Sequence, residues 1–514
     1  MMRAGRNALR LLAIARTLAR HDALFLLEDL AVAPAVPAIA RFLTRHGPKT
    51  PGGGRPGQRL ANALAECGPS FIKLGQALAT RSDLVSDEIA ADLSNLQDRL
   101  PPFSAAQARA AIREEFGEPV EVLFSDFDDT PIAAASIAQV HFATTADGRE
   151  VAVKVLRPGI EEAFDRDLDL FFWVADLIER TRPDWRRLKP VESVETFADT
   201  VAMEMDLRFE AAAAAELAEN FADDPTFHVP VVDWPRTGKR VLTTERIQGI
   251  RIDQRDALIA AGHRPDDILA KASMIFFKQV FRDGFFHADM HPGNMFVEAD
   301  GTLAAVDFGI MGRLDKRTRQ HLGEMLEGFL DRDYRRAAKA HFDAGWVPRT
   351  KSVEAFTQAC RSVGEPILDK PQNEISIARL LSQLFKITQT FEMETQPQLL
   401  LLQKTMLVAE GTGRKLNPDA NMWLLARPLI EAWRAEHMGP EALLRETADG
   451  MAATFQRLPQ LIEGVEQSAA MLAAGKVKLD EATLRELRRP RPLNPLPVLA
   501  VGAFLVAIVL MLLF

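Results

Sequence analysis

The region 284–309 carries two carboxylates and an amide in an ordered arrangement. Asp289 and Asn294 stand as D-x-x-x-x-N, and Asp307 opens a later Asp-Phe-Gly triplet. In phosphoryl transfer a carboxylate accepts or orients the proton of the attacking hydroxyl or water, and Asp289 fits this role. An amide and a second carboxylate are hard oxygen ligands for magnesium, which fits Asn294 and Asp307. Each piece is common in surface loops, but the ordered combination predicts a phosphoryl-transfer site.

Two short apolar segments should bring the predicted metal ligands together. Residues 295–297 and 303–306 are separated by an Asp-Gly turn, which predicts a β-hairpin. Asn294 and Asp307 would then lie near each other at the open end of this hairpin.

A second predicted hairpin, upstream, carries the candidate phosphate clamp. An Asp-Gly turn precedes residues 150–156, which read Glu-Val-Ala-Val-Lys-Val-Leu. Lys154 in this strand is expected to meet the α- and β-phosphates, and a glutamate on the next helix should hold it. Glu210 is the candidate, within one helix predicted over residues 196–221. Lys154, Glu210 and Asp289 form the predicted catalytic set.

The loop before this hairpin is rich in alanine where ordinary kinases place glycines. Its Cβ atoms restrict the backbone conformations and the approach of the loop to phosphate. A later strand, residues 240–247, ends in a hinge whose backbone groups would meet adenine. The residues expected to contact the nucleotide are Ile132, Ala133, Ala134, Ala135, Ser136, Ile137, Ala138, Gln139, Lys154, Glu245 and Ile247.

The composition limits the possible classes of protein. At 514 residues the chain should hold more than one domain-sized unit. A net charge of −9 argues against general nucleic-acid binding, because that binding relies on cations that meet phosphates. Cys67 and Cys360 are the two cysteines, which fit free thiols in a reducing compartment better than a disulfide framework.

The N-terminal segment 1–46 is basic and apolar, with no acidic residue before Asp22. Three alternatives fit it: a mitochondrial-type presequence, an amphipathic helix on an anionic membrane surface, or a helix packed on its own domain. Residues 47–57 are rich in glycine and proline and predict a flexible linker.

A helical pattern runs from Leu60 to about Leu100. Lys73 and Gln76 share one face of it, and by physical reasoning alone a solvated Lys and Gln are favoured there. Glu204 and Asp206, downstream, fit either a second role at the site or ordinary surface acids.

The C-terminal residues 496–514 contain no charged side chain. At about 1.5 Å per residue they span about 28 Å, close to the thickness of a bilayer core. Arginines on their N-terminal side predict that this side is cytoplasmic. A buried core helix is the alternative. The arginines are Arg485, Arg488, Arg489 and Arg491.

With these residues identified, the chain resembles the UbiB family of atypical kinase-like proteins, which is associated with ubiquinone biosynthesis. The resemblance covers most of the chain. One departure is Met290, where proline is expected, and it affects loop geometry rather than chemistry. The motifs are K-x-G-Q at Lys73, Gly75 and Gln76, the alanine loop Ala133–Ser136, Lys154, E-x-D at Glu204 and Asp206, Glu210, H-x-D-x-x-x-x-N at His287, Asp289 and Asn294, and Asp307.

The resemblance implies an α+β, protein-kinase-like fold with two lobes, an N-terminal helical extension over the site and a C-terminal transmembrane helix. Lys73, Gly75, Gln76, Glu204 and Asp206 would be regulatory, because the family places these motifs where a protein substrate would bind. The implied division is a basic segment 1–46, a linker 47–57, a helical extension 58–123, an N-lobe 124–248, a C-lobe 249–440, a helical tail 441–495 and a membrane helix 496–514.

The resemblance also implies an activity and its partners. ATP or ADP with Mg²⁺ would be the cofactors, and ATPase activity would support ubiquinone biosynthesis without phosphorylating proteins. The expected partners are membrane lipids, polyprenyl quinone precursors and other ubiquinone-biosynthesis proteins, and no nucleic acid. The expected location is the bacterial inner membrane, single-pass with a cytoplasmic catalytic domain, with the mitochondrial inner membrane as the alternative.

Two other functions remain open at this point. A small-molecule phosphotransferase of the aminoglycoside or choline kinase type shares H-x-D-x-H-P-x-N but would lack K-x-G-Q and a membrane helix. A non-catalytic scaffold would tolerate loss of Asp289 or Asp307, and both are present. Direct hydroxylation of the quinone ring is disfavoured by the sequence, which shows neither a dinucleotide fingerprint after a strand nor a redox metal set.

Overall fold

Contacts divide the chain into two compact units, Met1–Arg434 and Ala435–Phe514. The expected tail 441–495 and membrane helix 496–514 lie outside the residues that the structure describes. Among the described residues, no helix is both long enough and apolar enough to cross a bilayer. The computed structural model describes residues 2–25, 54–79, 85, 87–93, 96, 100–181, 189–368, 383–384, 386–388, 390–393, 396–419 and 427–433.

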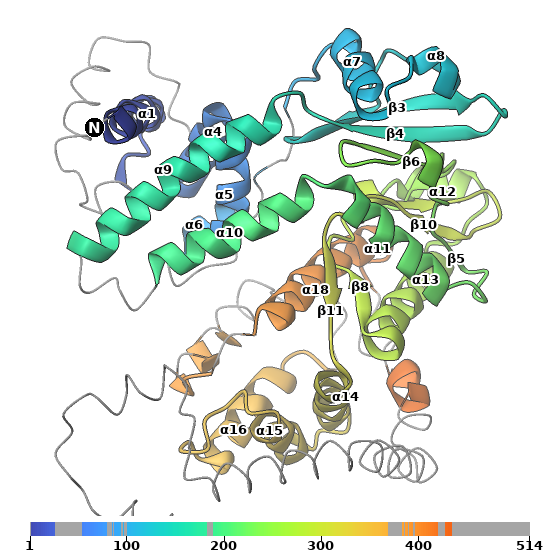
Figure 1. Ribbon diagram of the computed structural model, residues 1–514. Coiled ribbons are helices and arrows are strands. Elements are labelled where there is room, and N and C mark those ends of the chain that lie inside the picture. Colours follow the sequence, from blue (N-terminus) through green and yellow to red (C-terminus); the bar gives the residue numbers. More distant parts are fainter. Residues whose placement is uncertain are drawn as a thin grey trace, which may run out of the picture. The chain divides into compact units, whose positions relative to one another are not determined.

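The N-terminal part is a cluster of helices with its own apolar core (Figure 1). Leu60, Phe71, Leu93 and Leu170 are among its buried side chains, each from a different helix. The predicted linker is shorter than expected, because α4 begins at Pro56, and proline is well tolerated in the first turn of a helix. The helices are α1 (Met2–Arg20), α4 (Pro56–Cys67), α5 (Pro69–Ala79), α6 (Asp87–Leu93) and the long α9 (Ile160–Thr181).

Helix α1 packs on its own domain, as the third alternative for the N-terminal segment expects. It contacts α4 and α9, and its arginines pair with acids of α9. Arg10 makes a two-point contact with Asp167, Nε to Oδ1 at 3.0 Å and Nη2 to Oδ2 at 3.3 Å. Arg6 bonds Asp169 at 3.0 Å nearer the solvent. Arg6 and Arg10 of α1 thus make their ion pairs within the molecule.

The N-lobe is an antiparallel sheet in the order β1-β3-β4-β6, with β2 paired to β3. Val151, Val153 and Val155 of β4 face the core, so the alternate position, Lys154, faces the other side of the sheet. Its strands are β1 (Phe124–Phe127), β2 (Ala133–Ala134), β3 (Ala138–Thr145), β4 (Glu150–Leu156) and β6 (Val241–Glu245), and α7 (Ala105–Phe116) and α8 (Val120–Leu123) pack on it.

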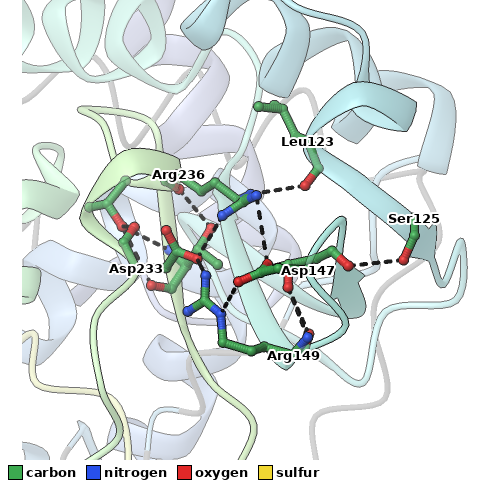
Figure 2. Close-up of polar contacts among 9 residues, drawn as sticks. Leu123, Ser125, Asp147, Arg149, Asp233 and Arg236 are labelled. Carbon is green, nitrogen blue, oxygen red and sulfur yellow. Dashed lines mark hydrogen bonds and ion pairs between the residues drawn. The ribbon is translucent and has the colours of Figure 1, made fainter.

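An ion-pair network closes the turn end of the β3–β4 hairpin (Figure 2). Arg149 and Arg236 both donate to Oδ2 of the buried Asp233, at 2.8 and 3.0 Å. Arg236 also donates from Nε to the carbonyl of Leu123 at 2.9 Å, and Arg149 donates to Asp147 at 2.7 Å. Three separate segments are therefore joined at this end of the sheet, next to the strand that carries Lys154, the predicted phosphate clamp.

The helix predicted over residues 196–221 is wrong at its centre, where the structure has two helices. α10 (Pro190–Glu204) ends, and α11 (Leu207–Asn220) begins after Asp206. The Asp206 carboxylate accepts a bond from the backbone N–H of Arg208 at 3.2 Å, as an N-cap residue does. Aspartate competes for backbone groups inside a helix, so this position starts a helix rather than continuing one.

The C-lobe combines two small sheets with helices. The predicted hairpin is confirmed: β9 pairs with β10 so that Met295 faces Ala305. Helix α13 (Pro265–Phe277) is followed by a wider, π-helical turn over Lys278–Asp283. The strands are β5 (Phe227–His228), β7 (Ile250–Arg251), β8 (Phe285–His287), β9 (Met295–Val297), β10 (Leu303–Ala305) and β11 (Met311–Arg313). The helices are α12 (Arg255–Ala260), α13 (Pro265–Phe277), α14 (Lys316–Leu330), α15 (Tyr334–Asp343), α16 (Val353–Gly364) and α18 (Pro397–Leu416).

The two arginine pairs of α1 should differ in their contribution to stability. Arg10→Ala leaves the Asp167 carboxylate, which is only 4% exposed, without its bidentate partner, and should lower the free energy of unfolding by about 1.5–3 kcal/mol. Arg6→Ala removes a pair in which the arginine is 64% exposed and should cost about 0.2–1 kcal/mol. Urea unfolding of the two variants measures the difference. Equal effects would show that burial of the pair has no influence.

Candidate active site

The centre of the site is an ammonium group held between two carboxylates. Lys154 Nζ donates to both oxygens of Glu210, at 2.8 and 2.9 Å, and to Oδ1 of Asp307 at 2.9 Å. These side chains come from β4, from the first turn of α11 and from the loop after β10. The structure thus brings together the predicted clamp, its predicted glutamate partner and one predicted metal ligand.

The three groups shift one another's ionisation. Burial alone would lower the pKa of Lys154, but the Asp307 and Glu210 carboxylates raise it well above its ordinary value. The Lys154 ammonium lowers the pKa of Asp307, and Lys73 adds to that shift from further away. Burial raises the pKa of Glu210, against the pull of Lys154. The arrangement therefore holds a positive lysine and a negative Asp307 at neutral pH.

The loop from His287 to Asn294 is fixed by its own hydrogen bonds. The buried His287 ring accepts from the Asp289 backbone N–H at Nδ1, 3.1 Å, and lies 3.2 Å from the Val306 carbonyl at Nε2. Burial lowers the pKa of His287, so the ring is neutral and its Nε2–H donates. The Asn294 side-chain amide donates to the Asp289 carbonyl at 3.1 Å. Asp289 is therefore held from both sides, with its carboxylate partly exposed.

Asn294 and Asp307 suit a magnesium ion. The Val306 N–H donates to the Asn294 carbonyl at 2.9 Å, which places Asn294 beside the residue that precedes Asp307. The Asn294 amide nitrogen donates to the Asp289 carbonyl, which leaves the side-chain oxygen as the atom suited to a metal ion. The Asp307 side chain is 50% exposed, with Oδ2 outside its contact to Lys154. Magnesium needs few protein ligands when phosphates supply the rest, so this pair is enough.

No cluster of three His, Cys, Asp or Glu side chains suited to a metal occurs within the described part of the chain.

Two of the predicted regulatory residues meet in a second ion pair. Lys73 Nζ on α5 lies 2.7 Å from Glu204 Oε2 at the end of α10, and both side chains are largely buried. The solvated-lysine alternative is therefore wrong for Lys73. Gly75 serves packing, because a Cβ there would lie 2.7 Å from Leu96 and 2.9 Å from Leu64.

The remaining members of that set do not join the pair. Asp206 turns to its own helix, where it caps α11 and pairs with Arg208 at 2.6 Å. Gln76 is half-buried on α5.

The alanine loop is a tight, partly buried turn. Ala133 and Ala134 pair with β3, and the Ala135 N–H donates to the Ala138 carbonyl at 2.8 Å. Ile132 is exposed, whereas Ile137 and Ala138 belong to the main core. The predicted nucleotide-contacting stretch is thus exposed at its start, at Ile132, and anchored in the core at Ile137 and Ala138.

Arg157 was not identified from the sequence, yet it holds this loop. Its guanidinium donates to the carbonyls of Pro101 at 3.1 Å, Ala135 at 3.1 Å and Ser136 at 3.2 Å. Burial lowers the pKa of Arg157, which stays charged because its ordinary value is so high. One arginine after a strand has no distinctive pattern, and its three partners are backbone atoms.

Gln139 reinforces the same anchor. Its side chain accepts from the Phe103 N–H at 2.9 Å and lies 3.2 Å from the Phe103 carbonyl and 2.8 Å from His141 Nε2. The Gln139 side chain is therefore committed to this anchor, and its backbone lies within the sheet between β2 and β4.

The predicted hinge is tied to the C-lobe by His228. Its Nε2 lies 3.2 Å from Glu245 Oε2 at the end of β6, and its Nδ1 lies 3.0 Å from Glu298 Oε1 after β9. The Val231 N–H also donates to Glu245 at 3.2 Å. Burial opposes protonation, but Glu298 and Glu245 outweigh it and raise the pKa of His228. Ile247, the other predicted hinge residue, is half-buried.

The site combines a strand lysine paired with a helix glutamate, an H-x-D loop fixed by hydrogen bonds, and the aspartate of an Asp-Phe-Gly triplet. Together these features define a protein-kinase-like site. Residues 95–341 match the ABC1 atypical kinase-like domain, and residues 360–421 match the UbiB helical domain. The α+β, kinase-like fold predicted from the sequence is confirmed.

Curated relatives are similar over most of the chain. A protein named "Probable protein kinase UbiB" from Marinobacter nauticus is 45% identical, over 79% of this chain and 75% of its own length. Its namesake from Vibrio cholerae is 44% identical, over 79% and 76%. The chain belongs to the UbiB family of atypical kinases, and this membership implies a role in ubiquinone biosynthesis.

A solved structure has the same fold. The structure of Rv3197 from Mycobacterium tuberculosis in complex with erythromycin has a TM-score of 0.51 and 25% sequence identity. The match covers 78% of this chain and 98% of that one.

The bridge through His228 should make stability depend on pH in a definite direction. The pKa of His228 is higher in the folded protein than in the unfolded chain. The stability that the protonated ring contributes is therefore fully present below the pKa of the unfolded chain, and it is lost as the pH rises through the pKa of the folded protein. His228→Asn should therefore reduce the free energy of unfolding more at about pH 5.5 than at about pH 9. Urea unfolding at both values measures this, with His263→Asn as a control histidine outside the bridge. If His228→Asn lowered the free energy of unfolding equally at both pH values, the ion-pair bridge through His228 would be contradicted.

Proposed function

We propose that this chain is a membrane-anchored, ATP-dependent atypical kinase that supports ubiquinone biosynthesis by acting on polyprenyl quinone precursors. The observation that carries the proposal is Lys154 held between Glu210 and Asp307, beside the fixed loop of Asp289 and Asn294. These are the groups that phosphoryl transfer requires, and all are in place in one site.

Each residue has a defined role in the proposed reaction. Lys154 binds the α- and β-phosphates of ATP, and the carbonyl of Glu245 and the N–H of Ile247 meet adenine, because the Glu245 N–H already donates to the Val231 carbonyl at 2.8 Å. Asn294 and Asp307 hold magnesium, which neutralises phosphate charge when bound. Asp289 accepts the proton of the attacking oxygen, which forms a new bond to the γ-phosphorus while the bond to the bridging oxygen breaks and its electron pair leaves with ADP. The partly buried alanine turn, Ala133 to Ala135, covers the phosphates.

The ion pair between Lys73 and Glu204 supports a role without protein substrates. It places α5 against the end of α10, directly before the helix that carries Glu210. A helical extension fixed at this position leaves less room for an extended protein segment to approach the site. A small diffusing or membrane-borne acceptor, or water, is the better match, and Lys73, Gly75, Gln76, Glu204 and Asp206 regulate that access.

Residues 496–514 supply the proposed anchor, because their length and lack of charge suit a bilayer core. The flanking arginines put the catalytic domain on the cytoplasmic side of a bacterial inner membrane. Such an anchor would keep the protein at the membrane that holds lipids and polyprenylated precursors.

Replacing the metal ligands should separate binding of magnesium-ATP from folding. Asp307→Asn and Asn294→Ala should each weaken magnesium-ATP roughly tenfold to a hundredfold, since each removes a contact worth about 1.5–3 kcal/mol. Titration and thermal stabilisation by ATP, with and without magnesium, measure this. Quinone profiling of a deletion strain complemented with Asp307→Asn should show the quinone defect of the deletion.

The matched control is Asp300→Asn, in the turn of the same hairpin, where either side chain accepts from the Thr302 N–H. Variants that bind like wild type would remove the metal assignment. Full quinone content with Asp307→Asn would favour the scaffold function.

The anchor can be tested by replacement as well as removal. Deleting residues 496–514 should release most of the protein from membranes. Leu505→Arg with Val509→Arg keeps the length but costs about 2.5–3.5 kcal/mol of insertion per arginine, so it should act like the deletion. Fractionation after a high-salt wash measures both. Retention of both variants in the washed membranes would mean that another segment holds the protein.

A further inference from the structure

Helix α18 lies outside the matched kinase-like domain, yet it contacts the catalytic loop. It falls within residues 360–421, which match the helical domain. The Thr405 hydroxyl is fully buried and lies 3.0 Å from the carbonyl of Ala288, the residue before Asp289, and 2.9 Å from that of Leu401 in its own helix. A buried hydroxyl needs such a partner, so α18 is seated on the loop at this point.

The far end of α18 is also fixed. Leu416 is buried in the main core, and its carbonyl accepts from Arg255 Nε at 3.0 Å. Asn417 donates to Asp266 at 2.6 Å. A helix held at both positions gives the side chains between them a defined direction.

Lys404 is next to Thr405 and reaches the catalytic carboxylate. Its Nζ lies 3.8 Å from Asp289 Oδ1. This is an ion pair rather than a hydrogen bond, and Asp289 is the sole carboxylate paired with Lys404 among the described residues. The Lys404 side chain is 43% exposed, so its flexible aliphatic part can move to bring the ammonium group to a ligand beside Asp289.

The catalytic loop itself supplies no cation. Residues 287–294 contain neither lysine nor arginine. The basic candidate at this point, His291, turns back to accept from the Gly293 N–H at 2.9 Å. Lys154 is engaged by Glu210 and Asp307, and Lys73 is engaged by Glu204. Phosphoryl transfer nevertheless gathers charge on the equatorial oxygens of the transferring group, where a cation lowers the barrier.

We propose that Lys404 supplies this second cation and binds the γ-phosphate of ATP beside Asp289. The inference rests on the proposed function. When water or an acceptor hydroxyl attacks, its proton passes to Asp289, the new phosphorus–oxygen bond forms, and the bond to the bridging oxygen breaks with its electron pair leaving on ADP. Lys404 forms and breaks no covalent bond, and it stabilises charge on the transferring group. The helical domain thereby contributes directly to the chemistry of the kinase-like domain.

The proposal predicts a distinction between ATP and ADP. In the full chain, Lys404→Ala should weaken ATP binding while leaving the affinity for ADP, which lacks the γ-phosphate, unchanged. The turnover number for ATP hydrolysis should fall roughly tenfold to a hundredfold. Lys404→Arg keeps the positive charge, so it should retain most of the ATP affinity and most of the turnover. Calorimetric titration with ATP and with ADP gives the affinities, and phosphate release gives the turnover.

The control variant is Lys415→Ala on the same helix, whose lysine is 59% exposed and pairs with Asp253 at 3.6 Å away from the loop. It should behave like wild type. Unchanged ATP affinity and turnover in Lys404→Ala would overturn the inference and leave the proposed function standing. Equal loss of ATP and ADP binding with a lowered melting temperature would also overturn it, by showing a structural role. Wild type that binds neither nucleotide would overturn both.

Discussion

One lysine cannot be buried in this site without two carboxylates, and that constraint organises the molecule. Lys154 is only 17% exposed, so removing its charge from water must be offset by close partners. Glu210 requires α11 to pack beside the N-lobe sheet, and Asp307 requires the C-lobe hairpin to reach the same point. Each requirement brings a different part of the chain to one ammonium group. The relative position of the elements is therefore an electrostatic requirement as much as a packing one.

A chain of contacts links this centre to the N-terminus. The Arg10 guanidinium lies 5.7 Å from the ring centre of Phe71 on α5, and Lys73 follows on the same helix. Arg10 also pairs with Asp167 of α9, so α1, α5 and α9 share one small set of interactions. The helical extension is thus built into the architecture of the site, although it lies far from the reacting groups in sequence. The alanine loop has a similar dependence on Arg157, whose partners span residues 101–136.

The sequence predicts those parts of the site that local pattern determines. Lys154, Glu210 and Asp307 are identifiable because strand alternation, motif spacing and hairpin turns are local signals. The break before α11 is not evident from the sequence, because the helical pattern continues on both sides of it. Asp206 is the one local signal, since aspartate is a favoured N-cap residue. Arg157, His228 and Lys404 could not be found, because their partners are backbone carbonyls or carboxylates distant in sequence. Only tertiary structure gives such residues a meaning.

The placement of Lys73 has a thermodynamic consequence. Its charge lowers the pKa of Asp307 while its ammonium pairs with Glu204, so the helical extension and the Asp307 carboxylate are electrostatically coupled. Coupling of this kind is reciprocal. A change of charge at Asp307 therefore alters the free energy with which Lys73 is held in place, and displacing Lys73 alters the free energy of ionising Asp307 to the same extent.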